Sequence, residues 1–363
     1  GKVYSTIGSV SCAHAILFLG YIKLNLLREN QKSLRSSIRF EVMMKWKSIT
    51  SVTLIAFLLS DVRGLDFSIF KFVRFPNEAC QAADGLKGVC YRPEECRELS
   101  GYSNGKCAQG YGVCCTFSKS GCGHTVKRNL TFIQNTDYPA RYKPDKETSC
   151  SVTIMKMSSA ICQLRLDLDR FELKDPDVEN NSGTCIIDKM ISNCGRKTLM
   201  PSNFCGNNTG QHVYLDISAA EKCVITFDIG ESQYGRIWNI LVSQIECNST
   251  ERAPEGCLQY FTENSGQVRS FNFKDDLSSK HLAMQSYSVC IRQNPNKCAI
   301  SWSARKDAIS PFGISSEAPG EPCESDRISI ITSTEEDFCG SSLKEASINC
   351  KCQNKLHSTV LTI

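Results

Sequence analysis

The chain has 363 residues, a formal net charge of +4 at pH 7 and 22 cysteines. The positive balance comes from residues 1–64, which hold nine Lys or Arg and three Asp or Glu, so the remainder carries −2. That balance offers no basic surface for nucleic acid or acidic lipid, and we expect neither as a partner. Every cysteine except Cys12 lies between Cys80 and Cys352, a density that predicts a disulfide framework made in an oxidising compartment.

Residues 43–64 have the pattern of a secretory signal peptide. A basic start is followed by the apolar run Ser48–Ser60 and then by small residues that suit cleavage before Leu65. The flanks favour this interpretation over a buried core helix, and the run of 13 residues is too short to span a bilayer comfortably. We therefore expect a secreted, extracellular protein with no membrane span in the mature chain.

Residues 1–42 precede this signal and carry a second apolar run, Ala13–Ile22. We interpret them as an upstream segment outside the folded protein. If the segment is retained, an uncleaved signal would instead anchor the chain in a membrane.

Six cysteines are spaced C-x9-C-x5-C-x10-C-x6-C-C over residues 80–115, among glycines, prolines and few apolar side chains. So small a segment cannot bury a self-sufficient core, so cross-links must hold it, although six cysteines allow fifteen pairings. The spacing and the final vicinal pair resemble the clip domains of arthropod extracellular proteins, and another small disulfide knot is the alternative. For a module at 76–116, the resemblance implies the pairs Cys80–Cys114, Cys90–Cys107 and Cys96–Cys115.

Strand-like runs follow Cys122. They are short, alternate apolar with polar residues and are separated by Gly, Asn and Pro, a pattern typical of half-buried antiparallel strands. In "CQLRLDLDRF", Leu164, Leu166 and Leu168 are expected on one face, with the charged residues in water. The "TFSKSG" that precedes Cys122 is expected to be a short linker.

Four landmarks recur at a nearly constant distance. Cys122, Cys162, Cys185-x-x-Asp188 and Cys205-Gly206 return as Cys257, Cys298, Cys323-x-x-Asp326 and Cys339-Gly340, at offsets of 135, 136, 138 and 134 residues. Such a repeat predicts two copies of one β-domain, over 121–249 and 256–363. The fold class expected is all-β, with two antiparallel β-sandwiches after a small disulfide-rich module.

The second copy differs from the first at its end. Only 24 residues follow Cys339, and they do not repeat the "WNILVSQIEC" of the first copy. We expect the second sandwich to be incomplete, to borrow a strand, or to have a divergent tail.

The repeated unit resembles the CUB domain, a β-sandwich of extracellular proteins. The resemblance rests on "DYP" at 137–139 and on "RLDLDRFEL", "CIID", "FCG" and "WNILVSQIEC". Together with "CGNNTGQHVYLD" and "APEGCLQYFTENSG", these motifs look like an arthropod group of secreted tandem-CUB proteins. The resemblance implies four disulfides: Cys122–Cys150, Cys185–Cys205, Cys257–Cys290 and Cys323–Cys339.

Further cysteines are extra to the CUB pattern. Among them we expect the pairs Cys162–Cys247 and Cys194–Cys223. Because 21 cysteines follow the leader, at least one of them has no partner within the mature chain.

The sequence shows no pattern for catalysis. A serine protease needs a nucleophile, a histidine and a carboxylate, whereas the chain has neither G-x-S-x-G nor G-D-S-G-G and only five scattered histidines. Zinc needs clustered ligands, and cysteines committed to disulfides cannot serve as thiolates. We therefore expect no enzyme activity, and we expect His212, beside a strand, to be structural or on the surface.

Calcium is the one cofactor that the CUB resemblance suggests. Many CUB domains hold it with a Glu at the end of an "F-x-x-E" strand, an Asp after the third cysteine and a later Asp. Asp188 and Asp326 match the second position, whereas Lys174 stands where the Glu would be and Glu172 comes two residues early. The candidate ligands are Glu172, Asp188 and Asp326; the alternative is that the aspartates cap turns beside a disulfide.

Four N-x-Ser/Thr sequons follow the signal and predict glycosylated surface loops, at Asn129, Asn180, Asn207 and Asn248. The sequence thus predicts a secreted, non-catalytic binding protein that recognises an extracellular protein, peptide or glycan through its CUB-like domains. The alternatives are a non-catalytic regulator or cofactor in an extracellular serine-protease cascade, acting through the clip-like module, and a structural component of the extracellular matrix.

Overall fold

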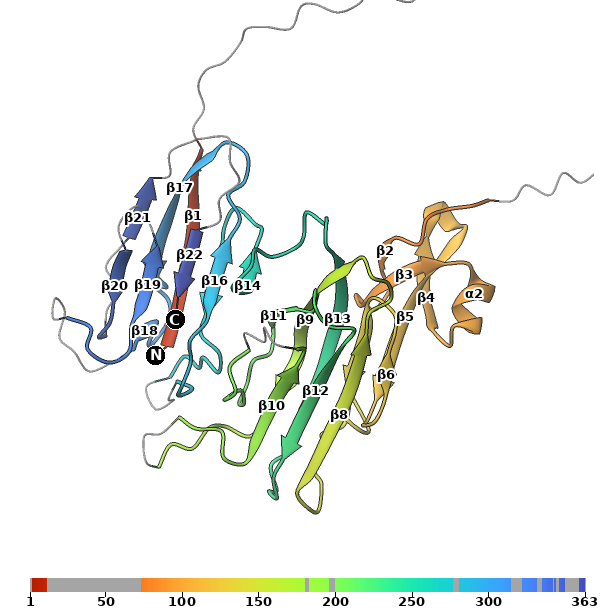
Figure 1. Cartoon of the computed structure of the whole chain (residues 1–363), viewed down its shortest axis with the longest axis horizontal. Helices are drawn as coiled ribbons and strands as arrows, with labels where there is room; N and C mark the ends of the chain where they lie inside the picture. The colour runs from red at the N-terminus through yellow and green to blue at the C-terminus, as the bar shows by residue number, and fades with distance from the viewer. Residues whose placement is uncertain are drawn as a thin grey trace, which may run out of the picture. The chain divides into compact units, whose positions relative to one another are not determined.

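The computed structural model describes residues 2–11, 73–179, 183–195, 200–276, 281–314, 322–331, 335–341, 343, 346–349 and 359–362 (Figure 1). The predicted signal peptide and the sequon at Asn180 lie outside these residues. The described residues form strands, apart from one short helix, α2 (Pro93–Glu98), and one 3-10 turn, η1 (Ala108–Gly110). The prediction of an all-β fold is confirmed. Within the same ranges, no helix is long and apolar enough to cross a membrane.

Residues 79–115 form a small sheet closed by three disulfides. Strands β5 (Gly112–Ser120), β3 (Lys87–Tyr91) and β2 (Ala79–Gln81) lie side by side in that order, and β4 (Tyr102–Cys107) pairs with the other edge of β5. The bonds are Cys80–Cys114, Cys90–Cys107 and Cys96–Cys115, the pairs that the clip resemblance implies. Gly101 is needed for this packing, since a Cβ there would lie 2.2 Å from the Sγ of Cys115.

The "TFSKSG" segment is a strand rather than the linker we expected. Residues Phe117–Ser120 belong to β5 and pair in parallel with β7 (Thr131–Gln134). Phe117 is buried beside Cys96 and Cys115, so burial of this side chain carries the strand past the last cysteine of the module. The linker prediction was wrong for this reason.

The first sandwich consists of two facing sheets. One has the order β10-β12-β8-β6 and the other continues β11-β9-β13-β7 into β5. The strands not yet bounded are β6 (Thr125–Val126), β8 (Thr148–Met155), β9 (Ile161–Glu172), β10 (Asp188–Asn193), β11 (Gln211–Asp216), β12 (Lys222–Ile229) and β13 (Ile237–Glu246). As predicted, Leu164, Leu166 and Leu168 are fully buried. Trp238 on β13 stacks on Phe227 of β12, with ring centroids 4.4 Å apart, and so joins the two sheets.

The second sandwich repeats this strand order. One sheet runs β14-β16-β22-β19-β20, and the other runs β15-β1-β17-β21 with β18 paired to β1. The strands are β1 (Lys2–Ser11), β14 (Cys257–Phe261), β15 (Gly266–Arg269), β16 (Ser288–Ile291), β17 (Lys297–Ala304), β18 (Phe312–Gly313), β19 (Ile328–Ile331), β20 (Glu335–Phe338), β21 (Ala346–Asn349) and β22 (Thr359–Thr362). Strands β21 and β22 take the places of β11 and β12, so these parts of the tail continue the repeat.

Strand β1 occupies the position that β13 has in the first sandwich. It pairs antiparallel with β15 on one side and with β17 on the other, and Figure 1 shows it in red among the blue strands of the second sandwich. Of the three alternatives for the end of the second copy, the structure therefore has a borrowed strand. Residues 2–11 of the predicted upstream segment are thus held in this sheet by strand pairing.

Among the described residues, six disulfides lie in the two sandwiches: Cys122–Cys150, Cys162–Cys247, Cys185–Cys205, Cys194–Cys223, Cys257–Cys290 and Cys323–Cys339. They coincide with the six pairs expected from the sequence. Cys162–Cys247 joins the start of β9 to the residue after β13, so it ties together two strands that pair along most of their length.

Candidate functional site

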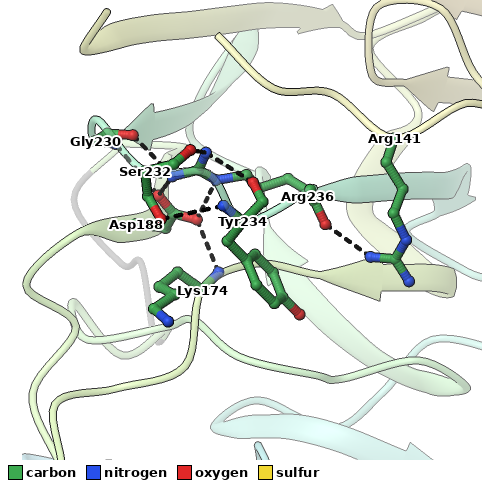
Figure 2. Close-up of polar contacts among 8 residues, drawn as sticks. Arg141, Lys174, Asp188, Gly230, Ser232, Tyr234 and Arg236 are labelled. Atoms are coloured by element: carbon green, nitrogen blue, oxygen red, sulfur yellow. Dashed lines mark hydrogen bonds and ion pairs between the residues drawn. The ribbon is translucent and has the colours of Figure 1, made fainter. Parts of the chain in front are cut away.

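A buried ion pair lies at one end of the first sandwich (Figure 2). Asp188 is the first residue of β10, and Arg236 directly precedes β13. The two side chains are 0% exposed, and the nearer contact, from Arg236 Nε to Asp188 Oδ2, is 2.8 Å. The second contact joins Nη2 to Oδ1 at 2.9 Å. The geometry is thus bidentate, the arrangement in which a guanidinium binds a carboxylate most strongly.

All five N–H groups of Arg236 have acceptors. Besides Asp188, they reach the carbonyl oxygens of Gly230 at 2.7 Å and of Ser232 and Tyr234 at 2.9 Å. The guanidinium therefore fixes the path of the loop between β12 and β13. A buried charge with every donor used avoids the penalty of an unsatisfied group.

The carboxylate of Asp188 is equally occupied. Oδ2 accepts the backbone N–H of Lys174 at 2.7 Å, and Oδ1 accepts that of Gly230 at 3.2 Å. Asp188 thus joins the loop after β9 to the loop after β12. Its role in the first sandwich includes the turn-capping expected as the alternative to calcium.

Glu172 belongs to a neighbouring, more exposed set of charges. Its carboxylate pairs with Arg141, and its Oε1 accepts from Arg170 Nη2 at 3.0 Å. The hydrogen bond that Arg141 donates to Glu172 raises the pKa of Arg141 above its ordinary value. Arg141 also donates to the carbonyl of Gly235 at 2.7 Å, and this brings it beside the same loop as Arg236.

The donor set of the first sandwich does not fit calcium. A hard cation needs several free oxygen ligands, whereas both oxygens of Asp188 hold Arg236, and Glu172 is held by two other arginines. Lys174 brings a further positive charge, with its Nζ 5.4 Å from the ring centroid of Tyr234. In the described part of the chain, no three His, Cys, Asp or Glu side chains form a group that could hold a metal ion.

The corresponding aspartate of the second sandwich has different surroundings. The side chain of Asp326 is 58% exposed, and its Oδ2 lies 3.5 Å from His281 Nε2. The candidate of the second copy thus lies at the surface beside a histidine, whereas its counterpart Asp188 is fully buried against Arg236.

A cavity of about 550 Å³ lies beside the ion pair. The loop after β9 supplies most of its lining, with Lys174, Asp175, Pro176, Asp177, Val178, Glu179, Ile186 and Ile187, and the remainder is Asn272, Lys274 and Asp276. Four of these side chains are acidic and two are basic. Lys274 Nζ lies 2.6 Å from Asp175 Oδ2, and Val178 and Ile186 are 50% and 68% exposed, so the lining combines a net negative charge with exposed apolar side chains.

His212 is a buried structural residue. It lies on β11 with 7% of its surface exposed, and its Nε2 is 3.1 Å from the backbone N of Tyr260. Burial, together with the nearby Arg165 guanidinium, lowers the pKa of His212 to about 4. A neutral Nε2 accepts the Tyr260 N–H, so the histidine helps to hold β11 against β14.

We expect this histidine to make stability depend on pH. Because its folded-state pKa lies below the ordinary value near 6.5, the contribution is full above about pH 6.5 and is lost as pH falls towards 4. The loss should reach about 3 kcal/mol of unfolding free energy. Urea unfolding at pH 7 and pH 4 measures it, with His212→Gln expected to remove this part of the difference and the exposed His124→Gln to leave it. An equal difference in all three proteins would contradict the assignment.

The three described sequons differ in exposure. Asn207 and Asn248 are exposed, whereas Asn129 is half-buried. The Oδ1 of Asn129 accepts the backbone N–H of Gln244 at 2.7 Å and that of Leu130 at 2.9 Å. Its amide nitrogen is the atom that would carry a glycan.

Sequence reasoning identified Asp188 but missed Arg236. Only the charge of Asp188 could have indicated Arg236, since an aspartate in a sandwich core needs a partner. It also missed the cavity, whose lining comes from segments about 90 residues apart. Only the folded loops bring these side chains to one place.

One protein family matches part of the chain. Residues 254–362 match the family model described as the animal CUB domain, so a CUB domain is found in the second sandwich. No curated protein matches the chain.

Similar solved structures include fragments of MASP-1. The MASP-1 CUB2 domain bound to Ca2+ is 24% identical, covering 34% of this chain and 98% of that one, with a TM-score of 0.27. The CUB1-EGF-CUB2 domains of rat MASP-1 are 16% identical, covering 68% and 99%, with a TM-score of 0.26. The same domains of human MASP-1/3 are 17% identical, covering 65% and 93%, with a TM-score of 0.25.

Proposed function

We propose that this chain is a non-catalytic extracellular binding protein in which both sandwiches are CUB domains. CUB domains are non-catalytic interaction modules, and one is found at residues 254–362. The first sandwich has the same strand order as the second, including the parallel pairing of its first strand. Nine disulfides among the described residues support secretion, because such bonds persist in oxidising compartments.

The proposed docking site is this cavity, whose lining carries a net negative charge and includes exposed apolar side chains. The single observation that carries it is the buried ion pair: Asp188, held by Arg236, accepts the backbone N–H of Lys174 and so fixes the loop after β9, which supplies most of the cavity lining. A fixed surface costs less entropy to bind than one that must be ordered first. The net negative charge of the lining and the exposed Val178 and Ile186 suit a protein or peptide segment with basic and apolar side chains.

The other parts of the proposal concern the flanking features. We propose that residues 76–116 act as a clip-like module and that Asn207 and Asn248 carry glycans on exposed loops. The alternatives of a protease-cascade regulator and a matrix component share this fold and differ in the partner.

Replacing Ile186 with aspartate should remove partner binding and leave the fold unchanged. Its side chain is 68% exposed, so the new charge costs little stability but opposes an apolar partner. Immobilised full-length chain should retain proteins from extracellular fluid of its source, and Ile186→Asp should retain at least tenfold less of them.

Tyr111→Asp is the matched control, because Tyr111 is 59% exposed and lies on the disulfide module. If both variants lose the same proteins, or neither does, the cavity is not the docking site. A serine protease among the proteins lost from Ile186→Asp would favour the regulator alternative. Labelling of the chain itself by an active-site serine probe would contradict the non-catalytic function.

A further inference from the structure

Two arginines at one end of the first sandwich share a single carboxylate. Arg141 donates to Glu172 Oε2, and Arg170 donates to Glu172 Oε1. The side chain of Glu172 is 16% exposed, whereas those of Arg141 and Arg170 are 44% and 47% exposed. One largely buried negative charge therefore holds two guanidinium groups that still face solvent.

Two lysines extend this positive charge. A Cβ added at Gly235 would lie 3.0 Å from Arg141 Cβ and 3.1 Å from Lys143 Cε, so both side chains pack beside the same glycine. The Nζ of Lys174 lies 5.4 Å from the ring centroid of Tyr234. Burial raises the pKa of Tyr234, and the nearby Arg141 opposes that rise. Tyr234 is thus close to both cations, and Figure 2 shows its ring between them. We call this set the cationic cluster: Arg141, Lys143, Arg170 and Lys174.

The acidic side chains beside the cationic cluster do not cancel its charge. Asp188 is paired with Arg236, and Asp175 is paired with Lys274, so each of these pairs is neutral. Of the four positive charges in the cluster, Glu172 balances one, which leaves +3. Because the residues after position 64 together carry −2, the positive charge is local to this end of the first sandwich.

Hydrogen bonds fix the base of the cationic cluster. Tyr142 and Arg236 form an isolated β-bridge, with N···O distances of 2.7 and 3.0 Å. Arg141 Nη1 donates to the carbonyl oxygen of Gly235 at 2.7 Å. The segment that carries Arg141 and Lys143 is therefore tied to the loop before β13. Cations that are fixed before binding lose less entropy when a ligand arrives.

We propose that the cationic cluster binds a sulfated polysaccharide. A guanidinium presents a planar fork of N–H donors that matches an oxyanion, and its delocalised charge persists at every pH at which the chain is folded. A sulfate ester is a permanent oxyanion of this kind. Three members of the cluster, Arg141, Lys143 and Arg170, do not line the acidic cavity, so the ligand lies across an open surface, where successive sulfates meet successive cations.

The surroundings of the cluster favour a polysaccharide over an acidic peptide. A peptide is usually anchored by apolar or aromatic side chains that fill pockets. The described residues expose no large apolar side chain in segments 141–143, 170–174 and 234–236. A surface that offers fixed cations without an apolar anchor suits a ligand that binds through charge alone.

Heparin, a sulfated polysaccharide, is the probe for this site. The full disulfide-bonded chain should be retained on immobilised heparin at physiological salt. The double variant Lys143→Gln, Arg170→Gln should bind at least about tenfold more weakly. The slope of log Kd against log salt concentration should also fall by about 2, because two fewer counterions are released from the polyanion. A purely structural role of these side chains would not change that slope.

The matched control is Lys106→Gln, Lys222→Gln. It removes the same charge from two exposed positions, on β4 and at the start of β12, and heparin affinity should change by less than about twofold. Equal losses in the two double variants would overturn the proposal, and so would failure of the wild-type chain to bind heparin. Equally tight binding of desulfated heparin would exclude recognition of sulfate, and equally tight binding of poly-L-glutamate would assign the cluster to an acidic peptide instead.

Discussion

Replacing Arg236 with methionine is expected to lower the unfolding free energy of the first sandwich by about 3–5 kcal/mol. The substitution keeps the apolar length of the side chain but leaves the carboxylate of Asp188, 0% exposed, with no cation beside it. Removing one partner of a buried pair costs this much because the remaining charge stays desolvated. Urea unfolding measures it, followed by Trp238 fluorescence in a Trp46→Phe, Trp302→Phe background.

The double variant Asp188→Asn, Arg236→Met should be more stable than Arg236→Met alone, since it buries no charge. It should not reach the wild-type value, because the carbonyl oxygens of Gly230, Ser232 and Tyr234 still lose their donor. Arg141→Met is the matched control: the Arg141 side chain is 44% exposed in its pair with Glu172, so the expected loss is below about 1 kcal/mol. Equal losses from Arg236→Met and Arg141→Met would contradict the buried-pair assignment.

The sandwich fold could be predicted because short sequence patterns, strand alternation and repeated cysteines, indicate it. The alternation around Leu164, Leu166 and Leu168 predicts a strand with one buried face, and these side chains are fully buried. Side chains along a strand alternate between its two faces, so an alternation of apolar and polar residues within a few positions shows which face is buried. The repeat of the cysteine landmarks predicts a second domain of the same fold, because a repeated fold repeats its cross-links.

The site depends on partners that no local pattern contains. Asp188 and Arg236 are 48 positions apart, and the choice between a guanidinium and a calcium ion at Asp188 depends on which loop returns to it. The sequence does hold one indication against calcium, because Lys174 is a cation at the position where a ligand glutamate is expected. Glu172 was a misleading candidate because nearby arginines take its carboxylate.

Strand β1 was missed because strand order was assumed to follow the chain. Its residues precede a predicted signal peptide, and sequence reasoning therefore set them aside. The repeat gave one indication: Cys298 corresponds to Cys162, whereas the second copy has no counterpart of the segment that ends in Cys247. Backbone pairing with β15 and β17 depends on long-range geometry, which composition and alternation do not specify.

Replacing both Cys162 and Cys247 with serine is expected to cost about 4–5 kcal/mol of unfolding free energy. The bond closes a loop of 85 residues, and in the chain-entropy model the stabilisation grows with the logarithm of loop length. Neither cysteine belongs to the buried core, so the loss should reflect the unfolded chain more than a cavity. Urea unfolding with the same Trp238 signal measures it.

The pair Cys122–Cys150 provides the comparison, since its loop of 28 residues predicts a loss about 1 kcal/mol smaller. If the double serine variant at Cys162 and Cys247 loses less than about 1 kcal/mol, the bond does not constrain the unfolded chain as the model requires.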